Sequence, residues 1–207
     1  MRPLNRDSLP HLVRCAWELV RFGVSTSRAR LNAAWWGIEL GPACEFYGTS
    51  VMRRLPGTRI VVGARCKFRS AVWSNLAGIN RPCILATVGE GAVLTIGDDC
   101  GFSGTAIGAA QSITIGARLM AGVNTMISDT DWHPVDPASR AAGGLGSSAP
   151  VTIGDDVWLG ANVLVLKGAR IGAGSSIAAN SVVTGEIPAG VLAGGVPARV
   201  IRTLVAS

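Results

Sequence analysis

The chain has 207 residues, of which 48% are hydrophobic and 15% are charged, and its formal net charge at pH 7 is +6. This length supports one domain with a substantial core and an appended end, while 27 glycines and few charges argue against a helical bundle. The basic residues form no long run, so we expect no nucleic-acid partner; a polyanionic small molecule or a membrane surface suits the charge as well.

The cysteines indicate a reducing compartment. They are odd in number, lie far apart and form no CxxC motif: Cys15, Cys44, Cys66, Cys83 and Cys100. This pattern argues against a disulfide framework and a zinc site, and two histidines are too few for a three-histidine metal site. No apolar run is long enough to span a bilayer and the first residues lack a signal-peptide core, so we expect a cytoplasmic protein.

Residues 1–37 are predicted to form a helical extension. Ser8 is a candidate N-cap, and a stripe of apolar residues follows on one helical face: Leu9, Leu12, Val13, Ala16, Leu19 and Val20. A second helical segment, residues 26–36, carries Arg28 and Arg30. Residues 8–36 either cap the repeat region that follows or lie peripherally on the inner face of the membrane. We favour the cap, because stacked repeats require one.

Residues 38–190 are predicted to form a parallel β-solenoid, an all-β fold. Between residues 153 and 184 the first positions of successive hexapeptides are all apolar: Ile153, Leu159, Val165, Ile171, Ile177 and Val183. A helix cannot keep this period, whereas short strands that turn a corner after each hexapeptide can. Three such strands close a triangular coil of about 18 residues, and stacked coils bury the apolar column. The period can be followed back to Leu40, with an irregular coil expected at residues 74–87.

The period stops at about residues 129–150, where the sequence is polar and rich in Pro and Gly. We expect a loop extruded from the solenoid, a place where rigid scaffolds often carry chemistry. His133 lies near its start, close to Asp129, Asp131 and Asp136. A histidine beside carboxylates is suited to act as a general base; the alternative is a merely solvated loop histidine. Its position in this loop favours the general base.

Residues 191–207 form a C-terminal tail with the sequence AGGVPARVIR near its start. Gly194 and Gly195 permit close approach of another molecule, and Arg199 and Arg202 lie three residues apart. Guanidinium groups placed in this way can bind phosphates bidentately. From the residues alone, a solvated basic tail explains the arginines equally well.

The hexapeptides of residues 153–184, the loop DTDWHPVDP and the tail AGGVPARVIR resemble those of the hexapeptide-repeat acyltransferases. The most similar branches are the maltose and galactoside O-acetyltransferases and the colanic-acid-type acetyltransferases of polysaccharide biosynthesis. The resemblance covers about residues 40–202. It implies a left-handed parallel β-helix, a handedness opposite to the usual right-handed crossover. It also implies a homotrimer with active sites between subunits, and acetyl-coenzyme A as the donor without a metal.

The same resemblance implies roles for individual residues. His133 matches the catalytic histidine, which takes the proton of the acceptor hydroxyl during direct attack on the thioester. Ser103 replaces an asparagine that helps the acceptor or the oxyanion, while Asp129 and Asp131 are candidates to orient His133 or to bind the acceptor. Residues that match contacts with coenzyme A, including the tail 191–207, are Trp158, Gly160, Ala161, Ala179, Thr184, Arg199 and Arg202. Gly185 replaces a lysine, so one phosphate contact is expected to be missing.

These implications predict an O-acetyltransferase that acts on a sugar or glycan precursor in exopolysaccharide or surface-polysaccharide biosynthesis. One alternative is a relative that acetylates an antibiotic, another small molecule, serine or a sugar amine. Another is a non-catalytic trimeric scaffold, which would need neither His133 nor the two C-terminal arginines. A γ-type carbonic anhydrase requires more histidines than the two present.

Overall fold

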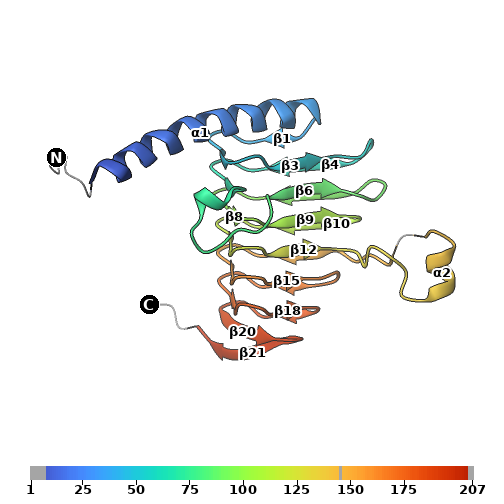
Figure 1. Ribbon diagram of the computed structural model, residues 1–207. Coiled ribbons are helices and arrows are strands. Elements are labelled where there is room, and N and C mark those ends of the chain that lie inside the picture. The colour runs from blue at the N-terminus through green and yellow to red at the C-terminus, as the bar shows by residue number, and fades with distance from the viewer. Residues whose placement is uncertain (1–7, 145, 205–207) are drawn as a thin grey trace.

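The computed structural model describes residues 8–144 and 146–204. Most of them form a stack of triangular coils that begins under the helix α1 (Ser8–Trp35) and ends with the strands β20 (Val191–Gly195) and β21 (Ala198–Thr203) (Figure 1). Each complete coil passes once through three sheets, which we call A, B and C. The predicted repeat fold with parallel sheets is therefore confirmed.

Each sheet gathers one strand from every coil. Sheet A contains, in spatial order, β1 (Glu39–Leu40), β4 (Arg59–Val62), β7 (Val93–Ile96), β10 (Ser112–Ile115), β13 (Val151–Ile153), β16 (Arg170–Ile171) and β19 (Glu186–Ile187). Sheet B contains β2 (Glu45–Tyr47), β5 (Lys67–Arg69), β8 (Gly101–Ser103), β11 (Met120–Ala121), β14 (Trp158–Leu159), β17 (Ser176–Ile177), β20 and β21. Sheet C contains β3 (Val51–Arg53), β6 (Ile84–Thr87), β9 (Ala106–Ala109), β12 (Met126–Ser128), β15 (Leu164–Val165) and β18 (Val182–Val183). Neighbouring strands are parallel except β20 and β21, which are antiparallel.

The hexapeptide period places equivalent residues above one another. Ile153 pairs with Ile171, Leu159 with Ile177 and Val165 with Val183. All six side chains are buried and form part of one continuous core. In the upper coils the rings of Phe46, Phe68 and Phe102 stack, with centroids 4.8 and 5.1 Å apart. The apolar column inferred from the sequence is thus the core of the β-helix.

The second residue of a hexapeptide must be small because the backbone at the corner of the next coil lies directly against it. A Cβ atom added to Gly172 would lie 2.3 Å from the backbone nitrogen of Ala189, and one added to Gly160 would lie 2.6 Å from that of Ala179. Neither glycine has a positive φ, so space rather than backbone freedom selects it.

We expect Gly172→Ala to lower the free energy of unfolding by about 1–3 kcal/mol, because the backbone of the next coil must shift. Gly185→Ala is the matched control, since no atom lies within 4 Å of its added Cβ atom. The control should stay within about 1 kcal/mol of wild type. Unfolding in guanidinium chloride at fixed protein concentration measures both. Equal losses in the two variants would contradict the spatial explanation.

The helix α1 is continuous, whereas the sequence was interpreted as two helical segments. It runs through Gly23, which has no atom within 4 Å of its Cβ position and costs only about 1 kcal/mol in an exposed helix. Its C-terminal half packs on the first coil, where Ala29 and Ala33 are buried and the backbone nitrogen of Phe46 donates to Thr26 Oγ1 at 3.1 Å. The other end of α1 extends beyond the coils (Figure 1).

The four cysteines in the coils are core residues. Cys44, Cys66, Cys83 and Cys100 are buried, and no cysteine of the described residues forms a disulfide. Burial raises the pKa of the Cys83 thiol, which disfavours a nucleophilic thiolate.

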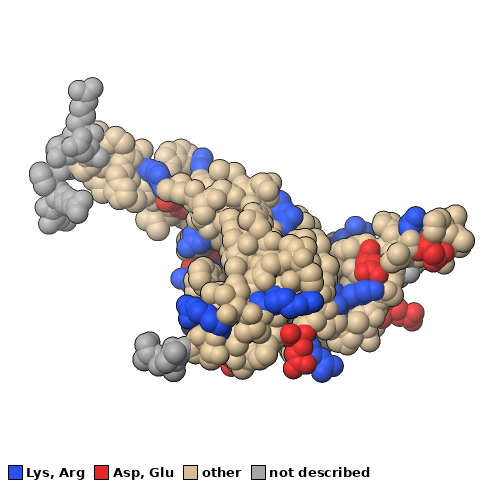
Figure 2. Space-filling view, turned by 90° about the horizontal axis from the view of Figure 1, so that it is seen from below, with Lys and Arg blue, Asp and Glu red and all other residues tan. Residues whose placement is uncertain are grey.

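Two insertions leave the stack. Residues 129–150 form a loop between β12 and β13 that contains α2 (Pro137–Ala141), and an antiparallel bridge between Thr130 and Ser148 closes its neck. This loop and α1 extend in different directions from the coils (Figure 2). Residues 70–83, with the short 3₁₀ helix η1 (Val72–Ser74), form the second insertion. The irregular coil expected at 74–87 therefore begins earlier, and its last four residues are β6. In the described part of the chain, no helix is both long and apolar enough to cross a membrane.

Candidate active site

The imidazole of His133 is presented at the neck of the loop. His133 is exposed, and its backbone nitrogen donates to the carbonyl of Asp131 at 2.7 Å. The opposite arm of the loop passes so close that a Cβ atom at Gly146 would lie 2.7 Å from the carbonyl oxygen of His133. The backbone of His133 is thus held on both sides while its ring is accessible from outside.

The indole ring of Trp132, the residue before His133, is a part of the candidate site that the sequence analysis did not predict. The φ of 64° at Trp132 is in the left-handed region, and a Cβ atom at Gly108 of β9 would lie 2.9 Å from Cζ2 of the indole. The ring therefore covers Gly108 while remaining 44% exposed. A glycine in the middle of a strand is the sequence signal for such a close approach.

Asp129 anchors the base of the loop. It is fully buried, and its two carboxylate oxygens accept hydrogen bonds from the backbone nitrogens of Ala110 at 2.6 Å and Gln111 at 2.8 Å. These bonds join the loop to the turn between β9 and β10. The hydrogen bonds of the Asp129 carboxylate therefore go to the preceding coil, and His133 is not among its partners.

Asp131 anchors the loop to the following coil. Its Oδ2 accepts a hydrogen bond from Ser147 Oγ at 2.9 Å and forms an ion pair with Lys167 Nζ at 2.5 Å. Lys167 also contacts Ser147. The Lys167 ammonium and, secondarily, the Ser147 hydroxyl hold the pKa of Asp131 below its ordinary value. Lys167, which follows β15, was not singled out from the sequence.

We expect Lys167→Met to loosen the loop, because it removes the cation that holds Asp131. Amide hydrogen exchange at residues 131–148 should accelerate, and kcat for the reaction proposed below should fall by about tenfold through misplacement of His133. Lys67→Met is the matched control, since Lys67 also forms an ion pair with a carboxylate, that of Glu45 at 3.3 Å, and lies away from the loop. Unchanged exchange in the loop would contradict this anchoring role.

Ser103 lies at the corner where sheet B gives way to sheet C. It is 8% exposed, and its hydroxyl accepts a hydrogen bond from Asn75 Nδ2 at 3.0 Å. Asn75 belongs to the 70–83 insertion, which the sequence placed in an irregular coil without a role. The insertion therefore contacts the residue that replaces the expected asparagine.

Trp158 and both C-terminal arginines share the outer face of sheet B. Trp158 pairs with Ser176, Ser176 with Leu192 and Leu192 with Arg202, which makes one column along the stack. A register shift in the β20–β21 pair leaves Ile201 without a partner. This bulge returns Arg202 to the face of Arg199, although the two are an odd number of positions apart, which would place them on opposite faces of a regular strand. The column spans about 15 Å at 4.8 Å per strand.

The corner beside this column is made of small residues. Gly160, Ala161 and Ala179 follow β14 and β17, and the stacked backbones at Gly160 and Ala179 leave no room for larger side chains between coils. Ala179 is exposed, as are Arg199 and Arg202. Because these side chains are small, the surface at this corner is flat enough for an extended ligand to contact the backbone.

The predicted site residues fall on opposite sides of sheet C: one group lies in sheet B or in the corner after it, the other in the corner or loop between sheets C and A. Those before sheet C are Ser103, Trp158, Gly160, Ala161, Ala179, Arg199 and Arg202; those after it are Asp129, Asp131, His133 and Thr184. Strands of two to four residues separate the two edges, a distance of about 7–13 Å plus the corners. One chain therefore does not bring His133 to its own arginines.

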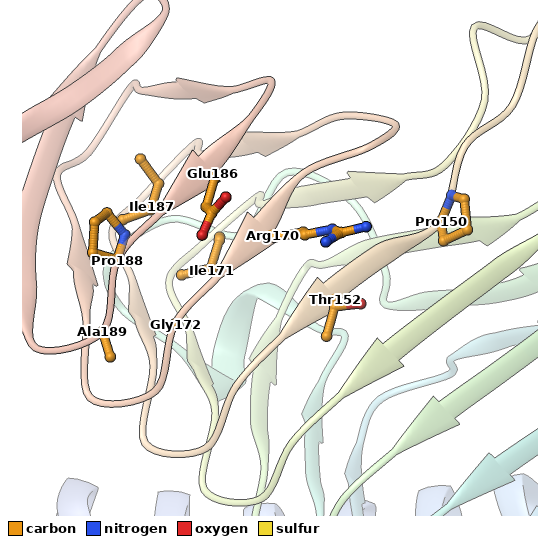
Figure 3. Close-up of a pocket in the computed structure, with 9 residues that line it drawn as sticks. All are labelled: Pro150, Thr152, Arg170, Ile171, Gly172, Glu186, Ile187, Pro188 and Ala189. Atoms are coloured by element: carbon orange, nitrogen blue, oxygen red, sulfur yellow. The ribbon is translucent and has the colours of Figure 1, made fainter.

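A separate hollow of about 330 Å³ lies on sheet A below the loop (Figure 3). Thr152, Arg170 and Glu186 line it from the successive strands β13, β16 and β19, and Pro150 closes it at the end of the loop. None of the site residues predicted from the sequence lines this hollow. We therefore assign it no part of the candidate site.

Comparison with known proteins identifies relatives with the same repeats. Residues 150–185 match the sequence family described as bacterial transferase hexapeptide (six repeats). A galactoside O-acetyltransferase of Escherichia coli (strain K12) is 43% identical over 93 residues, which cover 45% of each chain. A galactoside O-acetyltransferase of Lactococcus lactis is 36% identical over 147 residues, which cover 69% of this chain and 62% of the relative. The chain thus spans about half the length of the first relative and less than two thirds of the second.

Among solved structures, a hexapeptide-repeat-containing acetyltransferase from Vibrio cholerae has a similar fold. It superimposes with a TM-score of 0.58 at 26% sequence identity, and the match covers 88% of this chain and 82% of that chain.

Proposed function

Because the chain belongs to the hexapeptide-repeat transferase family, we propose that it transfers an acetyl group from acetyl-coenzyme A to a hydroxyl of a sugar or glycan precursor. The observation that carries the proposal is that one chain presents both an accessible, loop-held His133 and, on a separate surface, two arginines on one face of sheet B. Both relatives described above are named galactoside O-acetyltransferases, which supports a sugar as the acceptor.

In the proposed reaction His133 acts as the general base. Its imidazole accepts the proton of the acceptor hydroxyl while that oxygen attacks the thioester carbonyl. The C–O bond forms, the C–S bond breaks, and the imidazolium returns the proton to the thiolate of coenzyme A. Asp129 and Asp131 act as positioning residues, since each ties the loop to a neighbouring coil. Trp132 offers an exposed ring on which the apolar face of a sugar could stack.

Acetyl-coenzyme A is proposed to lie along the outer face of sheet B. Trp158 and the low corner at Gly160, Ala161 and Ala179 would line the pantetheine, and Arg199 and Arg202 would bind the phosphates. The column from Trp158 to Arg202 runs parallel to the stack and suits an extended donor. Thr184, on the other edge of sheet C, would contact a donor bound to the neighbouring subunit.

The separation of the two edges supports a homotrimer. A threefold arrangement places the edge after sheet C of one subunit beside the edge before sheet C of the next, so that His133 of one chain meets the arginines of another. We further propose that the coils are left-handed, and that the enzyme acts in the cytoplasm, at a membrane, on a precursor of a surface polysaccharide.

Ser103 favours one second candidate. Its side chain is shorter than that of asparagine, and its hydroxyl accepts a hydrogen bond from Asn75. The surface that it offers to the substrate that accepts the acetyl group therefore differs from that of an asparagine. An antibiotic or another small hydroxyl compound is therefore the alternative acceptor.

The proposal is tested by titrating acetyl-coenzyme A calorimetrically and then assaying release of free thiol with two acceptor panels at equal concentration. Galactosides, glucosides and oligosaccharides form one panel, and hydroxyl-bearing antibiotics form the other. We expect donor binding and thiol release with at least one sugar. Thiol release with antibiotics alone would favour the alternative. The absence of any donor binding would refute both and leave the scaffold hypothesis.

A further inference from the structure

The face of α1 that points away from the coils is largely apolar, although the exposed Ser27 and Arg30 interrupt it in the C-terminal half of the helix. Its exposed members are Leu9, Leu12, Val13, Trp17, Leu19, Val20, Val24, Leu31 and Trp35, each about half exposed or more. At 100° per residue they occupy roughly 160° of the helix, opposite the buried Ala29 and Ala33. A helix that merely capped the solenoid would turn charged and polar side chains outward, so this face indicates a further partner.

A row of arginines runs along one edge of this apolar face. Arg14, Arg21 and Arg28 recur every seven residues and therefore lie on one line of the helix. Trp17 and Trp35 lie between the row and the aliphatic residues, and the guanidinium carbon of Arg21 lies 5.6 Å from the centroid of the Trp17 ring. The helix contains four arginines against one acidic residue, Glu18.

A groove of about 490 Å³ opens beside the arginine row, between the N-terminal half of α1 and the 70–83 insertion. Its aromatic wall consists of Phe22, Tyr47 and Trp73, whose neighbouring ring centroids lie 5.0 and 6.3 Å apart. Arg69 lies over Tyr47, with its guanidinium carbon 4.7 Å from the ring centroid. The same insertion carries Asn75, which contacts Ser103. The groove thus adjoins the proposed acceptor side of the active site.

We propose that α1 lies on the surface of an anionic membrane and that the enzyme takes its acceptor from glycolipids of that membrane. The apolar face enters the acyl region, the two tryptophans lie at the interface, and Arg21 and Arg28 bind lipid phosphates, while Arg14 is paired with Glu18 at 2.7 Å. The sugar head group of the acceptor then occupies the aromatic groove, on the path to Ser103.

A lipid surface fits this helix better than a second copy of the chain. A two-fold contact between apolar faces would bring the arginine rows of both copies into one interface, where like charges repel. Anionic phosphates instead neutralise the row. In a threefold arrangement whose axis runs parallel to the stack, outside each subunit, all copies of α1 lie at the same end and can contact one membrane plane together.

The membrane contact is tested by co-sedimentation with vesicles of phosphatidylcholine, alone or mixed with phosphatidylglycerol. We expect binding to the mixed vesicles. Arg21→Gln/Arg28→Gln should bind them roughly 30-fold more weakly, at about fivefold per arginine. Arg65→Gln/Arg118→Gln is the control, because it removes the same charge from exposed ion pairs in the coils. Val13→Gln/Val20→Gln/Leu31→Gln, all on the outward face, should also bind weakly while keeping the unfolding transition of wild type.

Equal vesicle binding by wild type and both α1 variants would overturn the proposal. So would a change of oligomeric state in the Val13/Val20/Leu31 variant without vesicle binding by wild type, since the apolar face would then bind another copy.

The glycolipid acceptor rests on the proposed function and needs its own assay. Thiol release is compared for maltose in solution and dodecyl maltoside embedded in the mixed vesicles. We expect a lower KM for the embedded acceptor, with the difference reduced in Arg21→Gln/Arg28→Gln. Equal KM values would overturn the glycolipid preference. Transfer to neither acceptor, nor to any sugar of the panel, would refute the proposed function, whereas vesicle binding would still test the membrane contact.

Discussion

Replacing His133 by alanine should lower the rate of acetyl transfer by about 100- to 10,000-fold, the usual contribution of a general base. Affinity for acetyl-coenzyme A should stay within twofold of wild type. The physical reason is that His133 is exposed at the loop neck and that its imidazole forms no hydrogen bond with residues 8–144 or 146–204. Steady-state thiol release gives the rate, and calorimetry gives the affinity.

The loop should remain in place in this variant, because Asp129 and Asp131 anchor it independently of the imidazole. Hydrogen exchange at residues 131–148 serves as the control and should match wild type. A variant that keeps more than a tenth of wild-type kcat would remove His133 from the chemistry. Loss of donor binding together with activity would instead indicate a binding role.

Co-expression of two impaired variants should restore about a third of wild-type activity in the isolated mixed trimers. One chain carries His133→Ala and the other carries Arg199→Ala/Arg202→Ala, and the two bear different affinity tags so that mixed oligomers can be isolated. If each site uses His133 of one subunit and the arginines of its neighbour, every mixed trimer contains about one intact site in three. The double arginine variant alone should bind acetyl-coenzyme A at least about tenfold more weakly.

The mixed oligomers distinguish a shared site from a site within one chain. Every chain in the mixture lacks either the histidine or the arginines, so a site within one chain would recover nothing. Assays below the KM for acetyl-coenzyme A make the arginine defect visible. Separately purified variants, mixed after assembly, give the baseline.

Much of the fold could be predicted because each hexapeptide corresponds to one strand and one corner of a triangular coil. Ile153, Ile171 and Ile187 occupy equivalent positions in sheet A. The interruption of the period located the extruded loop. The position of a residue in the hexapeptide period also shows which corner of the coil it precedes. The placement of His133 and Arg202 on opposite sides of sheet C could therefore have been predicted from the sequence.

Other features depend on contacts that no period reveals. Lys167 reaches Asp131 only because the loop folds back over the next coil, and Asp129 is buried because two backbone nitrogens of the preceding turn need a partner. Trp132 covers Gly108 only because its backbone adopts a left-handed conformation. The continuity of α1 through Gly23 depends on packing further along the helix, which a local propensity cannot show.

The antiparallel hairpin at the end of sheet B has a further consequence. A stack of parallel coils offers open backbone edges at both ends, and such edges can recruit another chain and grow into a fibre. Strand β21 reverses direction over β20, carries a bulge and exposes Arg199 and Arg202, while α1 lies across the first coil at the other end. On sheet B the last parallel strand is therefore covered, and the same hairpin that bears the proposed phosphate-binding arginines disfavours end-to-end growth along this sheet.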